Sequence, residues 1–163
     1  VEGPWGKPHI ASGTAEPALH FNVSHAGDLA AFALCRSALV GVDIERIRAL
    51  PRRDAFARRV LSARERAVFQ ALPESRRTLA LLRAWTAKEA YLKGVGKGLS
   101  RPLPEIEVAF APAEAMRLEA VAGLPDAARR WSLSAFAPAP ETIGALAVAD
   151  PAPRVRWCSM IDL

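Results

Sequence analysis

Four charged residues of this sequence stand at spacings that suit the binding of a metal ion and a phosphate group. Asp43 and Glu45 are two residues apart in a run typical of a β-strand, so both carboxylates leave the same face of that strand. Glu89 and Lys93 are four residues apart in a run typical of a helix, so they lie on one helical face. Carboxylates without cysteine or histidine favour Mg²⁺, with Mn²⁺ as the alternative, and the lysine can neutralise a neighbouring phosphate.

The position of Glu89 within its helix supports this interpretation. It falls in the apolar stripe that contains Trp85, where a carboxylate needs a cation or hydrogen bonds because burying it alone is costly. The simpler alternative is an ordinary helix salt bridge to Lys93, which contributes only ~0.3–0.5 kcal/mol. Because Asp43 and Glu45 form the polar face of an otherwise apolar strand, a metal site made by all three acids is the better prediction.

Three other short patterns carry less information. Ser24 and His25 are adjacent in a predicted strand, so they point to opposite faces and are not expected to bond each other. They suit phosphate donors at a strand end or ordinary turn residues. The glycine-rich residues 94–98 follow a helix and lack the spacing of a phosphate-binding loop, which indicates helix termination. Lys7 and Pro8, which follow a glycine, indicate nothing by themselves.

These residues need a framework of strands and helices to position them, and the hydrophobic patterns predict an α+β fold with largely antiparallel sheet. Asp54 is expected to cap the first helix, and Ser62 followed by Glu65 is a capping box that opens the second. Strands are expected at 21–24, 29–36, 40–44, 106–110, 117–121, 131–137 and 143–149, with helices at 54–60, 62–71 and 74–94 and a further extended piece at 155–158.

The composition is that of a folded globular protein. The chain has 163 residues, of which 51% are hydrophobic, enough for one core or two small lobes that share one. No apolar run approaches the ~18 residues of a membrane-spanning helix, and the first residues given do not show the basic start followed by an apolar run that is typical of a signal segment. Cys35 and Cys158 are far apart in the sequence, which favours reduced thiols. We therefore expect a cytoplasmic protein without a membrane partner.

The positive charge is concentrated in one part of the chain. Ten arginines and three acidic residues lie between Arg46 and Arg77, which gives this arginine segment a charge of +7 against +5 for the whole chain. Such a surface attracts an anionic partner, although a solvated helix surface explains the charge equally well. Aromatic residues are not interleaved with the arginines, so nucleic acid is not the expected partner.

Taken in order, four of these patterns resemble the motifs of the Sfp-type 4′-phosphopantetheinyl transferases. The motifs of that family are Gly-Lys-Pro, Phe-Asn-x-Ser-His, Gly-x-Asp-x-Glu and Trp-x-x-Lys-Glu-Ala-x-x-Lys. They stand here at residues 6–8, 21–25, 41–45 and 85–93, and the region that they span covers roughly half of the chain. Each motif is weak alone, but the four in this order make a specific match.

The resemblance implies an activity and a role for each residue. The family transfers phosphopantetheine from coenzyme A to a serine of an acyl or peptidyl carrier protein. By this match, the metal ligands are Asp43, Glu45 and Glu89. The residues on coenzyme A are Lys93 and Asp43 at the pyrophosphate, Ser24 and His25 at its phosphates, and Lys7 and Pro8 at the nucleotide end. Glu89 is the expected base for the carrier serine, with Lys93 and Lys88 as further catalytic residues. For Lys88 the alternative is that it only pairs with an acid. The arginine segment is the expected docking surface for the carrier protein, with Arg46, Arg48, Arg52 and Arg53 nearest the metal.

The resemblance also implies a pseudo-twofold arrangement of two similar α+β lobes. Members of the family carry a longer segment before Gly-Lys-Pro, so the first lobe is expected to be incomplete at its N-terminal side. The expected division is 1–40 for the remainder of the N-terminal lobe, 41–150 for the C-terminal lobe with the metal site, and 151–163 for a tail. Because the first residue is Val1, a segment before it is expected to have been removed or to belong to a longer polypeptide.

Two other functions fit parts of the pattern. A metal-dependent nuclease also uses acids on a strand with an acid–lysine pair, but its Glu-x-Lys lies on a strand, whereas Glu89 and Lys93 have helical spacing. A non-catalytic basic module that docks an acidic protein leaves the three acids unexplained. Binding of coenzyme A would separate the transferase from both.

Overall fold

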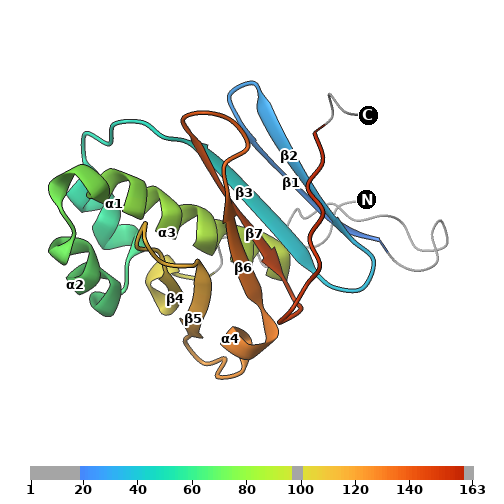
Figure 1. The fold of residues 1–163 in the computed structure, drawn as a ribbon. Helices are drawn as coiled ribbons and strands as arrows, with labels where there is room; N and C mark the ends of the chain where they lie inside the picture. The colour runs from blue at the N-terminus through green and yellow to red at the C-terminus, as the bar shows by residue number, and fades with distance from the viewer. Residues whose placement is uncertain (1–18, 97–100, 160–163) are drawn as a thin grey trace.

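The computed structural model describes residues 19–96 and 101–159. Strands and helices alternate in blocks along the chain, and the middle block is helical (Figure 1). The elements are β1 (His20–Ala26), β2 (Leu29–Cys35), β3 (Val40–Arg46), α1 (Arg53–Val60), α2 (Ala63–Ala71), α3 (Glu74–Val95), the 3-10 helix η2 (Leu103–Glu105), β4 (Ile106–Ala109), β5 (Arg117–Val121), α4 (Ala127–Arg130), β6 (Ser132–Phe136) and β7 (Thr142–Val148).

The strands form small antiparallel sheets, which confirms the predicted α+β class. The central sheet has the order β3-β7-β6, and β1-β2 and β4-β5 are two-stranded. In the central sheet, Asp43 lies opposite Ala145 and Glu45 opposite Ile143. Both acids therefore project from the face of β3 that meets α3, while Val42 and Ile44 project from the other face.

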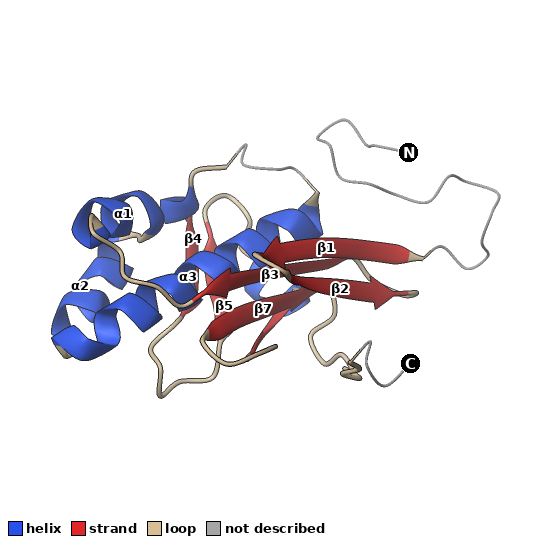
Figure 2. Cartoon of the chain, turned by 90° about the horizontal axis from the view of Figure 1, so that it is seen from above, coloured by secondary structure: helices blue, strands red, loops and turns tan. Residues whose placement is uncertain are grey.

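Helix α3 lies across the central sheet, with α1 and α2 packed at one end of it (Figures 1 and 2). Its contact with β3 is close because both elements have a glycine where they cross. A Cβ atom on Gly41 would lie 2.0 Å from the carbonyl oxygen of Ala90 and 2.3 Å from the amide nitrogen of Gly94. This crossing sets Asp43 and Glu45 beside the last turns of α3.

The hairpin β1-β2 packs against β3. A second apolar cluster, which includes Ala33, Val42 and Leu146, fills the space on the side of the sheet away from α3. Two side chains of β1 also hydrogen-bond to the backbone of β3: the amide of Val42 donates to Asn22 Oδ1 at 2.9 Å, and the amide of Ile44 donates to Ser24 Oγ at 3.2 Å. The hairpin thus brings Ser24 next to Asp43.

Most of the predicted elements are confirmed, and two details are wrong. Ser62 and Glu65 form the reciprocal hydrogen bonds of a capping box at the start of α2. Asp54 does not cap α1, because Arg52 occupies the N-cap position and Asp54 lies in the first turn. Residues 155–158 form no strand. The division at residues 40 and 150 and the pseudo-twofold relation of two lobes stay predictions.

No helix in the described part of the chain is both long enough and apolar enough to cross a membrane.

Candidate metal and phosphate site

Lys93, Asp43 and Ser24 form a compact polar cluster where α3, β3 and β1 meet. The Lys93 ammonium lies 2.6 Å from Asp43 Oδ1 and 3.0 Å from Ser24 Oγ. The Ser24 hydroxyl donates to Asp43 Oδ1 at 3.1 Å. The side chain of Lys93 keeps 31% of its surface exposed, whereas that of Asp43 keeps 8%. The cluster therefore presents one ammonium group at the surface and holds one carboxylate beneath it.

Lys93 pairs with Asp43 of β3 and not with Glu89 of its own helix, which was the alternative of an ordinary helix salt bridge. Such a bridge would join it to Glu89, but the structure gives Glu89 Oε1 no hydrogen-bond partner although this atom is buried. Asp43 Oδ2 is likewise buried without a partner. Two unpartnered carboxylate oxygens in one region are costly unless a cation binds them.

The electrostatics of Glu89 reflect this shortage of positive charge. Burial, and then the nearby carboxylates of Asp43 and Glu45, together raise the pKa of Glu89 from 4.5 to about 7 against the opposing effect of Lys93. Burial also raises the pKa of Asp43, despite the adjacent ammonium of Lys93. Three acids thus share one lysine, and a bound cation would supply the missing charge.

Glu45 is held by a group that the apolar stripe of α3 does not reveal. The indole Nε1 of Trp85 donates to Glu45 Oε1 at 3.3 Å. The stripe explains why Trp85 packs against the core, but the hydrogen bond depends on how β3 and α3 cross. The sequence signal for this hydrogen bond is the position of Trp85, four residues before Glu89 and therefore on the same helical face.

The protein supplies only part of a metal coordination shell. Within residues 19–96 and 101–159, no three acidic, histidine or cysteine side chains converge closely enough to hold a metal ion. The unpartnered oxygens of Asp43 and Glu89 nevertheless fit a cation, and Mg²⁺ usually binds through one or two carboxylates together with phosphate oxygens of its substrate. Residues and chemistry therefore agree with a cation that is completed by a phosphate-bearing ligand.

The remaining predicted phosphate contacts are only partly placed. His25 is exposed, while Ser24 is buried on the opposite face of β1, as the strand alternation predicts. Lys7 and Pro8 lie outside the described residues.

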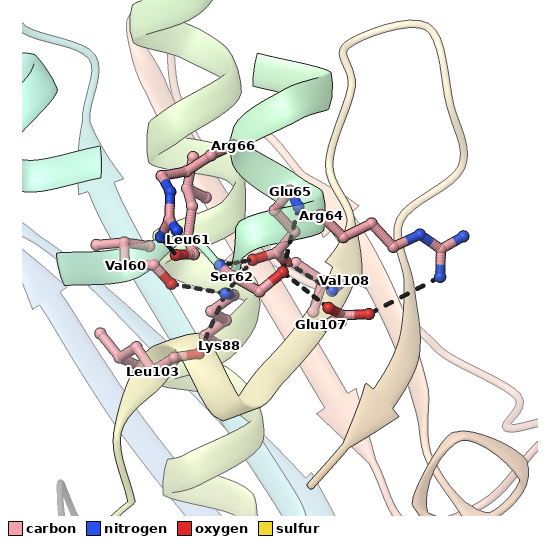
Figure 3. A network of polar contacts seen from close by, with 10 residues as sticks. All are labelled: Val60, Leu61, Ser62, Arg64, Glu65, Arg66, Lys88, Leu103, Glu107 and Val108. Atoms are coloured by element: carbon pink, nitrogen blue, oxygen red, sulfur yellow. Dashed lines mark hydrogen bonds and ion pairs between the residues drawn. The ribbon is translucent and has the colours of Figure 1, made fainter. Parts of the chain in front are cut away.

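The contacts of Lys88 favour the alternative that it only pairs with an acid, over a catalytic role. Lys88 has no exposed surface, and its ammonium lies in a polar network of its own (Figure 3). Its ammonium donates to Glu65 Oε2 at 2.5 Å and to the carbonyl oxygens of Val60 at 2.7 Å and Leu103 at 3.1 Å. All three donors are used, so Lys88 has a structural role.

The arginine segment divides into two groups. Arg46 pairs with Asp28, and Arg53 pairs with Glu74 at 2.6 Å. The expectation that Arg46 and Arg53 belong to the most important docking residues is therefore revised, since both have intramolecular partners. Five other arginines are exposed, and none of them forms an ion pair within the described residues. This exposed arginine group consists of Arg48, Arg52, Arg58, Arg59 and Arg76.

Comparison with known proteins gives this geometry a family context. Residues 39–149 match the sequence model of the 4′-phosphopantetheinyl transferase superfamily. The chain is 35% identical over 144 residues to the 4′-phosphopantetheinyl transferase HetI of Nostoc sp., a match that covers 88% of this chain and 57% of HetI. It is 36% identical over 104 residues to a 4′-phosphopantetheinyl transferase of Bacillus subtilis, with coverage of 64% and 44%. The chain thus spans about half the length of these relatives.

Solved structures agree on the fold. A holo-(acyl-carrier-protein) synthase of Bacillus anthracis in complex with CoA (3′,5′-ADP) superposes with a TM-score of 0.56 at 26% identity, over 71% of this chain and 98% of that one. The holo-[acyl-carrier-protein] synthase of Thermotoga maritima gives a TM-score of 0.55 at 21% identity, over 71% and 65%, and shows the shared fold alone. From the site, the sequence match and the fold together, the chain belongs to the 4′-phosphopantetheinyl transferase superfamily.

Proposed function

We propose that this protein transfers the 4′-phosphopantetheine group of coenzyme A to a serine hydroxyl of an acyl or peptidyl carrier protein and releases 3′,5′-ADP. The observation that carries the proposal is Glu89, a carboxylate with a buried, unpartnered oxygen and a pKa near 7 beside the pair of Lys93 and Asp43. A base with a pKa close to the working pH suits proton removal from a serine. The names of the matched relatives, transferases and holo-carrier-protein synthases, support the same reaction.

The residues of the site take complementary parts in this reaction. Glu89 accepts the proton of the carrier serine while the serine oxygen bonds to the phosphorus that bears pantetheine. The bond from that phosphorus to the bridging oxygen of the pyrophosphate breaks, and the electron pair leaves with 3′,5′-ADP. Lys93 offers its exposed ammonium to the pyrophosphate, where it stabilises the charge that builds on the leaving group. Ser24 keeps Lys93 and Asp43 in place through its two hydrogen bonds.

The proposal includes a divalent cation, Mg²⁺ with Mn²⁺ as the alternative, held by the unpartnered oxygens of Asp43 and Glu89, with Glu45 as a third ligand that closes on the cation when it binds. When bound, such a cation polarises the pyrophosphate oxygens and balances the negative charge of the three acids. The observation that supports a cation here is the pair of unpartnered carboxylate oxygens, Asp43 Oδ2 and Glu89 Oε1. His25, exposed on β1, and Lys7 and Pro8 are proposed contacts to coenzyme A. The cytoplasm is the proposed location.

The docking surface of the carrier protein is proposed to be the exposed arginine group. Its charge suits an acidic carrier, and the loop with Arg48 and Arg52 directly follows the strand that carries Glu45. The nuclease and the simple docking module have less support, because membership of the transferase superfamily gives no reason to expect either.

The test is mass spectrometry of an apo carrier protein after incubation with this protein, coenzyme A and Mg²⁺. We expect the carrier to gain one phosphopantetheine on its serine and the Asp43→Asn variant to give far less product. Coenzyme A binding is measured in parallel by calorimetry. Absence of both product and coenzyme A binding would refute the proposal and favour the alternatives.

A further inference from the structure

Trp85 occupies an unusual place between the candidate metal site and helix α1. Its indole N–H donates to Glu45 Oε1 at 3.3 Å. The ring of Phe56 from α1 also packs against it, with ring centroids 5.0 Å apart and an interplanar angle of 49°. Trp85 also precedes Glu89 by one helical turn, so the indole and the Glu89 carboxylate share one face of α3. The indole thus contacts both an acid of the site and an aromatic ring.

We propose that Trp85 is a positioning residue for Glu45, and this inference rests on the proposed metal-dependent function. A carboxylate on a strand can rotate about its terminal bond, so either oxygen can face a cation. The indole N–H engages Oε1 and leaves Oε2 as the oxygen that is free to bind the metal. Outer hydrogen bonds of this kind orient metal ligands, and their loss typically weakens metal affinity or activity by ~10–100-fold.

A role in core packing alone does not account for this arrangement. Trp85 is partly buried, and a backbone carbonyl would serve as well as a carboxylate to accept its N–H. Here the acceptor is a carboxylate close enough to Glu89 to raise its pKa. The ring of Phe56 packs against the indole and restrains it, so α1 indirectly supports the orientation of Glu45. Packing alone predicts a loss of stability on mutation, whereas positioning predicts a loss of metal affinity in a protein that is still folded.

The experiment is a titration of the protein with Mn²⁺ alone, followed by calorimetry. Trp85→Phe keeps an aromatic ring against Phe56 and removes the N–H donor, and we expect Mn²⁺ binding to weaken by at least about tenfold. Trp131→Phe is the matched control, because Trp131 packs edge-on against Tyr91 of the same helix, at 5.2 Å and 76°, rather than against an acid. This control should bind Mn²⁺ within about twofold of the unmodified protein. Circular dichroism verifies that each variant is folded.

A double-mutant cycle tests whether Trp85 acts through Glu45. In a Glu45→Gln background, Trp85→Phe should weaken Mn²⁺ binding by less than about twofold further, because its partner has already been removed. A loss of similar size in both backgrounds would overturn the inference. Unchanged affinity of Trp85→Phe, with normal binding by the unmodified protein, would also overturn it and leave the proposed function intact.

The remaining outcomes separate the two proposals. If the unmodified protein does not bind Mn²⁺, the metal site fails and the role of Trp85 fails with it. If Trp85→Phe does not fold, Phe56→Leu replaces it, since this variant keeps the indole donor and removes the ring that restrains it. We then expect Mn²⁺ affinity to fall severalfold, and an unchanged affinity would overturn the inference.

Discussion

Glu89 is the residue on which the proposed chemistry of this site depends. It lies beside two other acids and one lysine, and its raised pKa follows from burial and from the charges of Asp43 and Glu45. Such a carboxylate is protonated in part near neutral pH and becomes fully charged when a cation binds. Binding of the proposed metal ion would therefore displace this proton, so the metal affinity would depend on pH.

We predict that Mn²⁺ binding to the protein without other ligands weakens by about tenfold per pH unit below about pH 7. The cation needs the deprotonated carboxylate, so each binding event below this pH displaces a proton from Glu89. Above about pH 7 the affinity should level off. Calorimetric titrations from pH 5.5 to 8 in buffers of different ionisation heat would measure both the affinity and the proton release, roughly spanning the expected pKa. A flat profile would contradict the assignment of Glu89 to the metal.

The same pKa predicts a change in the stability of the metal-free protein. The folded-state pKa of Glu89, about 7, lies above its ordinary value of 4.5. The stabilisation from protonated Glu89 is therefore fully present below about pH 4.5 and is lost as the pH rises towards about 7. Urea unfolding of Glu89→Gln should lack this component, and the difference between the two proteins isolates it from all other titrations.

Glu89→Gln should also separate turnover from binding. The variant keeps the shape of the side chain and removes the charge and the proposed base, so transfer to the carrier should fall by at least ~10²-fold. Coenzyme A binding should fall less, because Lys93 and Ser24 remain. Single-turnover rates and coenzyme A titrations give the two quantities, and near-normal turnover would refute the catalytic role.

The buried network around Lys88 fixes α3 to the elements on its other side. Glu65 of the α2 capping box accepts from Lys88 and also from the amide of Val108 in β4, at 2.9 Å (Figure 3). Ser62 Oγ extends the network to Glu107 at 2.8 Å. One lysine thus joins α2, α3, η2 and β4, and burial lowers its pKa against the opposing effect of Glu65.

Lys88→Met should destabilise the fold by about 3–5 kcal/mol, because it leaves a buried carboxylate without its counter-charge. The double variant Lys88→Met/Glu65→Gln should recover part of this loss, since the remaining group is neutral. Arg64→Ala is the control at the exposed end of the same network and should cost less than ~0.5 kcal/mol. Urea unfolding measures all three, and a Lys88→Met variant of unchanged stability would contradict the structural role.

The stability of the protein should also be sensitive to added volume where β3 and α3 cross. Gly41→Ala would place a methyl group against backbone atoms of Ala90 and Gly94, which cannot move independently of α3. We expect a loss of more than ~3 kcal/mol together with the loss of Mn²⁺ binding, since overpacking here also separates Asp43 from Lys93. Gly123→Ala is the control: its φ is +72° in open space, so strain of about 1–2 kcal/mol is expected without effect on the metal.

Some arginines of the arginine segment bond within the fold, and others are exposed on the surface. Arg53, Arg66 and Arg77 bond to Glu74 or to backbone carbonyls, so they stabilise the helical end of the molecule. The exposed arginine group has no such partners among the residues that the structure describes, and it lies on the segment that follows β3. A partner of opposite charge would meet this surface at the entrance expected for the carrier serine.

Arg48→Glu/Arg52→Glu should therefore lower kcat/KM for the carrier protein by about tenfold or more at low salt, with little change in coenzyme A affinity. The loss should shrink as salt approaches physiological strength, where the screening length is ~8 Å. Arg129→Glu/Arg130→Glu reverses an equal charge on α4 and serves as the control. If the control has the same effect, net charge rather than docking explains the result. If coenzyme A affinity falls instead, Arg48 and Arg52 belong to the nucleotide site.

The sequence by itself determined the features that depend on neighbours along the chain. The alternation around Asp43 and Glu45 predicted one polar strand face, and Ser62 with Glu65 predicted a capping box, because both patterns act within a few residues. The order of the motifs predicted the family before any comparison. The spacing of Glu89 and Lys93 also predicted a shared helical face, but it could not determine which acid forms an ion pair with Lys93.

Only the tertiary structure decided the partners of the charged groups. Lys93 pairs with Asp43 because two glycines let β3 approach α3 closely, a contact between residues about 50 positions apart. Lys88 lies next to Glu89 in sequence, but a helix turns by about 100° per residue, so the two side chains leave α3 in different directions. Helix α3 is covered by the sheet on one side and by α2 and η2 on another. Its charged residues therefore divide between a functional site and a structural network, which no spacing along the chain could distinguish.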